Sequence, residues 1–580
     1  MKLVGPQWQG LPEGEVFDVV VVGAGGAGMS AALFAAMGGA RVLLVEHTGQ
    51  VGGTTAWSAG TTWVPGTEHG RRVNPQDSLA AAATYLDAAV GERSPAALRQ
   101  AFLAHGAEAV AHAEAHSQLR WRPYPKHPDY QSELPGSTLA GRALEPLPFD
   151  GRLLGEHFAL LRPPIPEFTV LGGMMVDRTD INHLLAMKRS WPSFKHSAWI
   201  LLRHLSDRLR HPRGTRLVMG NALVGRLLYS LMQHPQVTLC LNTEVSRLST
   251  HAQGVDGLEL QQGQARRCVN ARGGVVLASG GFNRHPQRRA QWLPGIAPEW
   301  SPAAPGLSSH TEHIHDQALS LGARYAEGGL SPAFWAPVSL RKRPDGSTAS
   351  FPHFVMDRAK PGMVTLNQAG ERFVNESTSY HLFGLAMQAA HKTSPAVPAY
   401  LVCDQDALRK YGLGMVRPGG QGLAPFLADG YLMRADTLDE LAVQLGMAPA
   451  NLQRSVAQLN AHAGSGVDAD FGRGRTAYEQ NLGDASWPGP NPSLGPLKKP
   501  PYYAIRLYPG DIGASAGLAT DASARVWRGD APLPGLYAVG NDMQSIMGGV
   551  YPAPGITLGP GLVFAFLAAR DALARAGAAA

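Results

Sequence analysis

The 580-residue sequence has few of the features that mark disulfide-rich or membrane-spanning proteins. It contains only three cysteines (Cys240, Cys268 and Cys403) without C-x-x-C spacing, so it encodes neither a disulfide framework nor a zinc site. No run of about 18 apolar residues occurs, so we expect no transmembrane helix. Residues 1–17 lack the cationic start and apolar stretch of a signal peptide, and we expect a cytoplasmic protein.

Charged residues are also scarce, at 17% of the chain against roughly 25% in an average soluble protein. The net charge is only +6, so no basic field indicates nucleic acid as a partner. The 68 glycines and 44 prolines stay below the share of roughly 25–30% that indicates disorder. Hydrophobic residues make up 44% of the chain, which is enough for a large core. The composition therefore predicts a large, loop-rich globular protein.

The first 50 residues have the pattern of a strand, a helix and a second strand. Residues 17–22 form an apolar, β-branched run typical of a parallel strand buried on both faces. Residues 29–37 have a helical composition, and residues 41–45 are the second predicted strand. Further strands of the same sheet are predicted far downstream, at 237–241, 274–278 and 536–539.

A glycine-rich motif follows the first predicted strand and opens the predicted helix. Residues 23–28 read Gly-Ala-Gly-Gly-Ala-Gly, which fits the dinucleotide-binding pattern G-x-G-x-x-G. In that pattern Gly23 permits the tight turn, Gly25 lets a diphosphate approach the backbone, and Gly28 lets helix and strand pack closely. Glu46 ends the second strand, where an acid binds ribose hydroxyls, so the sequence predicts a dinucleotide cofactor.

Four further blocks carry a resemblance to a known family. They are GGTTAWSAG (52–60), LNQAGERFVNESTSY (366–380), PYYAIRLYPGDIG (501–513) and MGGVYPAPGITLG (547–559). In this order they resemble the FAD-dependent fumarate reductase and succinate dehydrogenase flavoprotein superfamily, and within it the 3-ketosteroid Δ1-dehydrogenases. The likeness extends over nearly the whole chain and implies FAD as the cofactor.

The resemblance implies an α/β fold with a discontinuous, Rossmann-like FAD-binding domain over residues 1–295 and 499–580. An inserted α+β catalytic (capping) domain would cover residues 296–498, with substrate held in the cleft between the two. Some relatives attach FAD through a histidine, but residues 52–60 contain none and His47 should lie at the ribose end. We therefore expect non-covalent FAD.

The predicted cofactor-binding residues form two groups. The first surrounds the phosphates and the ribose: Gly23, Gly25, Gly26, Ala27, Gly28, Glu46, His47, Gly53, Thr54, Thr55, Ser58 and Gly60. The second completes the adenosine end and follows the ribityl chain to the flavin ring: Val245, Ser279, Gly280, Gly540, Asn541, Gly555, Thr557 and Leu558. The helix that opens at Gly559 would direct its positive end at the flavin.

An absent arginine indicates the kind of substrate. Fumarate reductases have an arginine in the segment before the last helix, whereas residues 547–555 contain none and have Tyr551 instead. This difference favours a neutral carbonyl over a dicarboxylate. By resemblance, the Tyr551 hydroxyl and the Gly555 N–H polarise the ketone oxygen, and one such donor is typically worth about 3 kcal/mol when an enolate forms.

The resemblance also implies a base. Tyr380 stands at the position of the family's proton-abstracting tyrosine, and a second tyrosine, Tyr130 or else Tyr124, would support it. Free tyrosine titrates near 10, so Tyr380 must be deprotonated by its surroundings or pass its proton on at once. The predicted reaction takes the α-proton, moves a hydride from the β-carbon to flavin N5 and leaves a conjugated enone. Quinone, oxygen or a carrier would then accept the electrons.

Several alternatives stay open. The same chemistry could act on a smaller cyclic ketone such as a cyclohexanone, or introduce a Δ4 double bond into a steroid. A fumarate- or enoate-type reductase would need an arginine from elsewhere, such as Arg341 or Arg343. A flavin-binding regulatory protein without turnover is the alternative of another class.

Two other segments have less specific patterns. Residues 188–216 combine eight Lys or Arg residues with interleaved apolar ones; we expect the apolar face to pack on the core, with peripheral membrane contact as the less favoured alternative. His310, His313 and His315 do not have the H-E-x-x-H spacing of a zinc site, so we expect no metal there.

Overall fold

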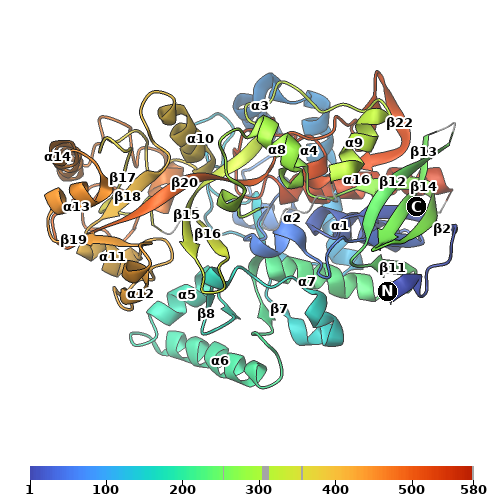
Figure 1. The fold of residues 1–580 in the computed structure, drawn as a ribbon, viewed down its shortest axis with the longest axis horizontal. Helices are drawn as coiled ribbons and strands as arrows, with labels where there is room; N and C mark the ends of the chain where they lie inside the picture. The colour runs from blue at the N-terminus through green and yellow to red at the C-terminus, as the bar shows by residue number, and fades with distance from the viewer. Residues whose placement is uncertain (252–253, 304–311, 355–356, 578–580) are drawn as a thin grey trace.

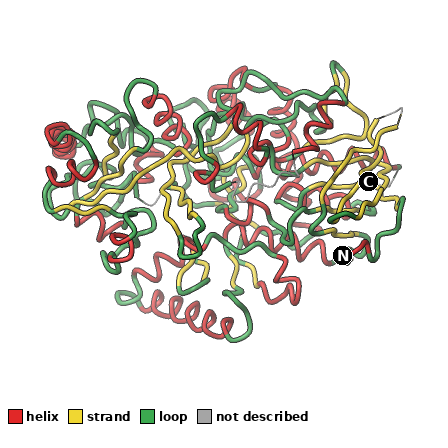
Figure 2. Tube along the Cα trace, in the orientation of Figure 1, coloured by secondary structure: helices red, strands yellow, loops and turns green. Residues whose placement is uncertain are grey.

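The computed structural model describes residues 1–251, 254–303, 312–354 and 357–577. One large sheet lies at each end of the longest axis of the molecule, and helices and loops cover both (Figure 1). Loops join the elements throughout, as the glycine and proline content predicts (Figure 2).

The first sheet has nine strands and a parallel centre. Its order is β1-β11-β3-β2-β14-β13-β12, and β22 pairs with both β14 and β21. Parallel pairing joins the central strands β11, β3, β2, β14 and β22. The strands are β1 (Lys2–Leu3), β2 (Glu15–Val22), β3 (Val42–Val45), β11 (Val237–Cys240), β12 (Glu244–His251), β13 (Gly254–Gln262), β14 (Ala265–Leu277), β21 (Arg525–Arg528) and β22 (Ala531–Ala538).

The strand–helix–strand unit predicted at the start of the chain is confirmed as β2, α1 (Gly26–Met37) and β3. Val19, Val20 and Val21 of β2 are completely buried, because helices and loops cover both faces of a parallel strand. The three strands predicted downstream correspond to β11, β14 and β22 of the same sheet. The C-terminal segment therefore returns to the sheet that the N-terminal residues begin.

The second sheet has six strands in the order β16-β15-β20-β18-β17, with β19 on β20. These strands are β15 (Ala333–Lys342), β16 (Thr348–Pro352), β17 (Met363–Leu366), β18 (Ala399–Cys403), β19 (Met433–Ala435) and β20 (Tyr502–Ala514). Three small sheets complete the strands: β4 (Thr62–Trp63) with β5 (Trp121–Pro123) and β6 (Ala143–Pro146), β7 (Phe149–Asp150) with β10 (Arg216–Leu217), and β8 (Thr169–Val170) with β9 (Met174–Met175).

Strand β20 departs from the predicted domain boundary at residue 499. It pairs with β15 and β18, so residues 502–514 belong to the sheet of segment 296–498 rather than to the first sheet. A sequence pattern does not say which of two sheets a strand joins, so the assignment of residues 502–514 rests on the pairing of β20.

Sixteen helices appear in the described parts of the chain besides short 3-10 turns. Helix α1 packs against α7 and α16, and α10 packs against β15 and β20. The other bounds are α2 (Glu68–Val73), α3 (Leu79–Val90), α4 (Ala96–His116), α5 (Arg178–Leu185), α6 (Trp191–Arg208), α7 (Met219–Met232), α8 (Pro286–Trp292), α9 (Glu312–Ser320), α10 (Tyr380–His391), α11 (Gln405–Tyr411), α12 (Ala424–Ala428), α13 (Leu438–Leu445), α14 (Pro449–Ser465), α15 (Ala477–Leu482) and α16 (Leu558–Ala576).

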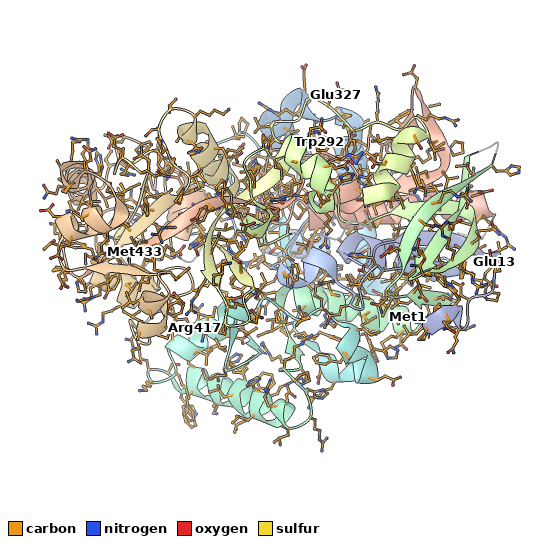
Figure 3. All side chains as sticks on the ribbon, in the orientation of Figure 1. Met1, Glu13, Trp292, Glu327, Arg417 and Met433 are labelled. Carbon is orange, nitrogen blue, oxygen red and sulfur yellow. The ribbon has the colours of Figure 1, made fainter. Side chains whose placement is uncertain are left out.

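Helices α5 and α6 form a lobe at the lower edge of the molecule (Figure 1). Arg343 of the segment after β15 pairs with Glu167 at 2.8 Å, and the Arg417 guanidinium donates to the Thr169 carbonyl at 2.6 Å. Arg417 is labelled where the second sheet's loops approach this lobe (Figure 3). These two contacts attach the lobe to the second-sheet region.

Helix α6 buries a mostly polar face and exposes its apolar residues. Its buried positions are Ser193, Ser197, Ile200, His204 and Asp207. The apolar side chains are largely exposed: Trp191 65%, Phe194 42%, Trp199 51%, Leu202 66% and Leu205 63%, followed by Leu209 85% just past the helix. The expectation that the apolar face of residues 188–216 packs on the core is therefore wrong. Hydrogen bonds hold the buried face instead, including those that Asp207 accepts from Thr215 at 2.8 Å.

Candidate active site

The glycine motif forms a turn that leaves room for a ligand only at its middle. Gly23 has φ +102°, and a Cβ on Gly28 would lie 1.8 Å from the Gly23 carbonyl oxygen, so both positions require glycine. A Cβ on Gly25 would meet no heavy atom within 4 Å. The backbone of Gly25 therefore faces open space in front of the N-terminus of α1, where a diphosphate can approach N–H groups.

Glu46 lies at the end of β3 and is 5% exposed. It accepts hydrogen bonds from the Ala24 N–H at 2.9 Å and from the N–H and hydroxyl of Thr48 at 3.0 and 2.8 Å. Burial favours the protonated carboxyl, but the contact with His47 at 3.1 Å and these donors outweigh it and lower the pKa of Glu46 to about 2. Glu46 is thus ionised beside the glycine turn.

Two hollows lie near the two ends of the glycine turn. The first is lined by His47, Val245 and Ser279 among the predicted residues, together with Val22, Gly23, Val45, Thr243, Glu244 and Ile314. The second is lined by Gly540, Asn541 and Thr557 among the predicted residues, together with Phe334, Ala514, Met543, Gln544, Ser545, Ile546, Ile556, Pro560, Gly561 and Phe564. An open glycine turn with a hollow at each end fits the shape of FAD, whose diphosphate joins an adenosine to a flavin.

The loop after β3 contributes the next predicted residues to the cradle. The Gly26 N–H donates to Thr55 Oγ1 at 3.2 Å, and a Cβ on Gly53 would lie 3.3 Å from the Gly25 Cα. Thr54 Oγ1 donates to the Ala303 carbonyl at 2.9 Å. Residues 53–55 therefore lie directly against the glycine turn.

Five other predicted residues lie beside the cradle without lining either hollow. Ser58 accepts the Gly220 N–H at 3.0 Å, and Gly60 approaches the same residue, so both shape the loop against the start of α7. A Cβ on Gly540 would lie 2.8 Å from the Ala27 Cβ, so Ala27 packs where α1 meets the second hollow. Gly280 has φ +108° in the turn after β14, and Leu558 begins α16.

Three tyrosines from distant parts of the chain converge beside the second hollow. The Tyr130 and Tyr380 hydroxyl oxygens are 3.2 Å apart, and the Tyr551 ring stacks on the Tyr130 ring with centroids 5.9 Å apart. The Tyr380 and Tyr551 ring centroids are 5.1 Å apart. Phe334, which lines the hollow, contacts Tyr551 at 5.0 Å. The structure therefore brings together the three tyrosines that the sequence singled out, whereas Tyr124 packs on His127.

Burial keeps all three phenols protonated. It raises the pKa of Tyr380 well above its ordinary value, and the neighbouring phenols Tyr130 and Tyr551 raise it further. Burial likewise raises the pKa of Tyr130, and it raises the pKa of Tyr551 although contacts with Tyr380 and Thr557 partly offset this. Tyr380 is consequently a neutral phenol whose oxygen accepts a hydrogen bond from a second neutral phenol, Tyr130.

Gly555, four residues after Tyr551, has a backbone N–H that is not used within the protein's described residues. Its φ is +88°, and a Cβ there would lie 2.4 Å from the Thr61 carbonyl oxygen, so the turn requires glycine. Its carbonyl accepts the Trp63 N–H at 3.2 Å and the Gly559 N–H at 2.9 Å, but its own N–H has no acceptor among the described residues. The loop thus fixes the Gly555 amide while leaving it free to donate to a ligand.

A buried ion-pair network holds this loop and Tyr130 together. The Tyr130 N–H donates to the Pro552 carbonyl at 2.7 Å, and so does the Tyr85 hydroxyl at 2.6 Å. Asp129, adjacent to Tyr130, accepts the indole N–H of Trp63 at 3.0 Å and a guanidinium N–H of Arg142 at 2.9 Å. The Trp63 backbone N–H also donates to the Gly555 carbonyl. Asp129 is therefore linked to Tyr130 as its neighbour in the chain and to Gly555 through Trp63.

Sequence reasoning missed several residues around these sites. Tyr478 packs on Tyr130 at 4.6 Å and Phe354 on Tyr380 at 4.9 Å, and no local motif signals either one. Asp542 accepts the Gly281 N–H at 2.7 Å and lies 2.9 Å from His315 Nε2; its position directly after Gly540 and Asn541 was a usable signal. Asp129 directly precedes Tyr130, and this position was a second usable signal.

The residues of the alternative interpretations lie in other surroundings. Arg341 pairs with Asp429 at 2.6 Å, and Arg343 pairs with Glu167, so neither guanidinium is available to a dicarboxylate. Of the three-histidine pattern, His310 and the side chain of His313 lie outside the described residues. His315 contacts Asp542 and the Tyr325 hydroxyl, the latter at 2.5 Å.

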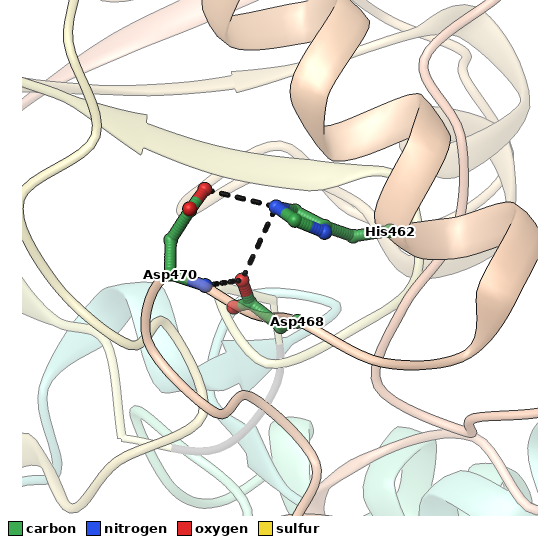
Figure 4. Close-up of side chains that lie close together, drawn as sticks. All are labelled: His462, Asp468 and Asp470. Atoms are coloured by element: carbon green, nitrogen blue, oxygen red, sulfur yellow. Dashed lines mark hydrogen bonds and ion pairs between the residues drawn. The ribbon is translucent and has the colours of Figure 1, made fainter.

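His462, Asp468 and Asp470 form the one group of potential metal ligands among the described residues (Figure 4). His462 Nε2 lies 2.9 Å from an Asp470 oxygen and 3.7 Å from an Asp468 oxygen. Asp468 is also paired with Arg372 at 2.8 Å. Because the guanidinium already neutralises Asp468, the group is an ion-pair network that fixes the loop after α14.

A family model described as an FAD binding domain matches residues 18–558. The chain belongs to this family. FAD is therefore its cofactor, and the mixed α/β fold is that of this group of flavoproteins. No helix among the described residues combines the length and the apolar character that crossing a membrane would require.

Members of the family that act on cyclic ketones are similar over nearly the whole chain. The 4-oxocyclohex-2-ene-1-carboxylate 5-dehydrogenase of Sinomonas cyclohexanicum is 36% identical, over 96% of this chain and 93% of its own. The 3-oxosteroid 1-dehydrogenase of Mycobacterium tuberculosis is 36% identical, over 97% and 99%. The crystal structure of 3-ketosteroid delta1-dehydrogenase from Sterolibacterium denitrificans, in complex with 1,4-androstadiene-3,17-dione, matches with a TM-score of 0.88 at 34% identity, over 97% of this chain and 100% of that one. The resemblance to 3-ketosteroid dehydrogenases predicted from the four sequence blocks is confirmed.

Proposed function

We propose that this flavoprotein introduces a C=C bond next to the carbonyl of a neutral cyclic ketone, with a 3-ketosteroid as the first-choice substrate. The observation that carries the proposal is the convergence of Tyr130, Tyr380 and Tyr551 beside the hollow that Phe334 and Thr557 line. The relatives' activities on ketosteroids and on oxocyclohexene carboxylates support the same chemistry.

Each residue of the cluster has a distinct part in this mechanism. The Tyr551 hydroxyl and the unused Gly555 N–H donate hydrogen bonds to the ketone oxygen and stabilise the charge that develops as the α-proton leaves. Tyr380 takes that proton as a phenolate, after its own hydroxyl proton has been released to bulk solvent, and the Tyr130 hydroxyl, which donates to the Tyr380 oxygen at 3.2 Å, stabilises the phenolate. FAD, when bound, supplies the acceptor for the hydride from the β-carbon. The aromatic rings around the cluster exclude water from the reacting atoms.

The cluster favours an uncharged substrate. The rings in contact with Tyr130, Tyr380 and Tyr551 are aromatic or histidine rings, from Phe334, Phe354, His127, His381 and Tyr478. The buried guanidinium of Arg358 behind them donates to the carbonyls of His353, Phe354, Glu376 and Thr378, so it is occupied by the protein. Because Arg358 is engaged in this way, it offers no cation to a carboxylated cyclohexanone, which is why we place a steroid ketone first and a small oxo acid second.

Anaerobic mixing of the FAD-loaded protein with a ketone tests the proposal. Androst-4-ene-3,17-dione should bleach the flavin absorbance, 4-oxocyclohexanecarboxylate should do so more weakly, and succinate should leave it unchanged. Bleaching by succinate alone would overturn the proposal. Stronger bleaching by the oxo acid than by the steroid would move the substrate assignment to the smaller ketone.

We also propose an arrangement for the two sheets: a Rossmann-like FAD domain built on the first sheet, with the second sheet as the inserted capping domain. The discontinuous first sheet, which β22 closes by parallel pairing with β14, supports this division. The convergence of Tyr380 from the second region with Tyr130 and Tyr551 supports a substrate site between them.

The exposed face of α6 supports peripheral contact with a membrane. Its exposed Trp191, Phe194, Trp199, Leu202 and Leu205 lie among exposed basic side chains, namely Lys188, Arg189, Lys195, Arg208 and Arg210. Apolar residues flanked by cations are what an interfacial helix presents to anionic lipids. We therefore propose that the α5–α6 lobe contacts a membrane surface, from which a steroid could enter.

A further inference from the structure

Two arginines near the glycine turn form no ion pair with any carboxylate among the described residues. Arg284 ends the short 3-10 turn Phe282–Arg284 and is 8% exposed. Its one hydrogen bond joins its guanidinium to Thr54 Oγ1 at 3.4 Å, and no carboxylate in the described parts of the chain pairs with it. Burial of an unpaired guanidinium is costly, so its position needs a physical reason.

Arg162 approaches the same region from the segment after Leu160. Its guanidinium donates to Thr48 Oγ1 at 3.0 Å and lies over the Trp57 ring at 5.3 Å. It too forms no ion pair with a described carboxylate. Burial lowers the pKa of Arg162, and burial together with the nearby charge of Arg162 lowers the pKa of Arg284. The two cations therefore repel one another in a poorly solvated space.

The carboxylate of Glu46 is near both arginines but is already engaged. It accepts two hydrogen bonds from Thr48 and one from the Ala24 N–H, and it contacts His47. Asp542 also acts on Arg284, but it is bound by Ser279, Gly281 and His315, so neither carboxylate pairs with the two guanidinium groups. The space between them is thus electropositive before any ligand enters.

The geometry places Arg284 across the glycine turn. Its partner Thr54 is adjacent to Thr55, whose Oγ1 accepts the Gly26 N–H. A Cβ on Gly280 would lie 3.4 Å from Arg284 Nε, and Gly25 faces open space. Arg284 therefore borders the opening that the glycine turn leaves for a diphosphate.

We propose that Arg284 and Arg162 clamp the diphosphate of FAD from the side opposite the N-terminus of α1. The helix end offers N–H groups and a partial positive charge, whereas the arginines add full charges that can bind phosphate oxygens in pairs. The anion in turn relieves the repulsion between the two guanidinium groups. Both residues act in cofactor binding, independently of the substrate chemistry proposed above.

The proposal is tested on the full-length chain, FAD-depleted and FAD-loaded, with Arg284→Gln, Arg162→Gln and the double variant. Arg213→Gln is the matched control, because Arg213 also lacks a carboxylate but donates to Asn221 at 3.1 Å and stacks on Phe158 at 4.5 Å. Fluorescence titration of the depleted protein should show FAD dissociation constants about tenfold or more weaker for Arg284→Gln, as expected for loss of a charged hydrogen bond, and little changed for Arg213→Gln.

Two further readouts separate binding from a structural role. Thermal unfolding should show the FAD-depleted Arg284→Gln protein at least as stable as the FAD-depleted wild type, because a repelling cation is gone, while the loaded variant melts lower than the loaded wild type. ADP should raise the melting temperature of the wild type more than that of the double variant, whereas adenosine, which has no phosphate, should act equally on both. The proposal would be overturned if Arg284→Gln bound FAD as tightly as Arg213→Gln. It would also be overturned if the double variant lost the rise in melting temperature caused by adenosine to the same extent as the rise caused by ADP.

Discussion

The hydroxyl oxygens of Tyr130 and Tyr380 lie 3.2 Å apart although 250 positions separate the two residues in the chain. Tyr130 lies in the loop between β5 and β6, where its N–H donates to the Pro552 carbonyl. Tyr380 begins α10 of the second region. Burial keeps both phenols protonated, so Tyr380 must release its own proton before it can act as a base. The hydrogen bond that Tyr130 donates then stabilises the Tyr380 phenolate.

This pair predicts coupled kinetic effects. Tyr380→Phe should slow flavin reduction by a ketone about 100-fold or more, as is typical when a general base is lost. Tyr130→Phe should slow it less, and the double variant should be no slower than Tyr380→Phe alone. The raised pKa values also predict a wild-type rate that increases as the pH rises towards the alkaline range. Stopped-flow measurement of flavin reduction in the four proteins checks this, and independent, additive effects would contradict the coupling of Tyr130 to Tyr380.

Trp63 and Trp121 allow a matched test of the network around Asp129. Both side chains are buried, but the Trp63 indole N–H donates to Asp129 whereas that of Trp121 has no partner among the described residues. Trp63→Phe should lower the free energy of unfolding by about 1–3 kcal/mol more than Trp121→Phe, because it leaves a buried acceptor unsatisfied. It should also slow flavin reduction, since the lost indole bond helps to fix Asp129, which adjoins Tyr130. If urea unfolding showed the same loss of unfolding free energy for Trp63→Phe and Trp121→Phe, the indole hydrogen bond to Asp129 would make no contribution to stability.

Glu46 predicts a specific acid sensitivity. Its pKa is about 2 in the folded protein against an ordinary value of 4.5, so its stabilising effect is complete above about pH 4.5 and is lost as the pH falls towards 2. The shift corresponds to roughly 3 kcal/mol. Glu46→Gln should therefore be less stable than the wild type at pH 7 by up to this amount, and the gap should shrink as the pH falls below 4.5. Denaturant unfolding of the FAD-depleted proteins at several pH values measures the gap, and a gap independent of pH would contradict this account.

The α5–α6 lobe predicts binding to anionic vesicles. Wild-type protein should sediment with phosphatidylserine-containing vesicles at low salt and less so with phosphatidylcholine alone or at high salt. Replacing Leu202, Leu205 and Leu209 by serine should abolish sedimentation without changing ketone turnover in detergent-free buffer. The control replaces Val443 in α13 and Val467 just after α14, which are also exposed but lie outside the α5–α6 lobe, by serine. Equal binding of both variants would refute the lobe as the contact.

Features formed by residues close together in the chain could be predicted from the sequence. The glycine turn, Glu46 and the strand–helix–strand unit were readable because each is a local pattern. Tyr551, Gly555, Tyr380 and Tyr130 were found through the resemblance of whole blocks, and the structure brings the three tyrosines together.

The sequence could not predict what depends on partners far along the chain. Trp63, Tyr478 and Arg284 have no motif of their own, since their partners Asp129, Tyr130 and Thr54 are distant in sequence. Residues 502–514 were assigned to the segment 499–580 of the FAD-binding domain but pair with the second sheet as β20, and α6 was expected to bury the face that it exposes. A sequence pattern shows that a strand or an apolar face exists but not what pairs with it or covers it.

The most direct test of the account is the rate at which an excess of androst-4-ene-3,17-dione reduces the bound flavin in the wild type and in Tyr551→Phe. The account predicts a reduction about 100-fold or more slower in the variant, since one donor to a developing oxyanion is lost, with FAD bound as tightly as in the wild type. Equal rates in the two proteins would contradict it, because the Tyr551 hydroxyl would then take no part in activating the ketone.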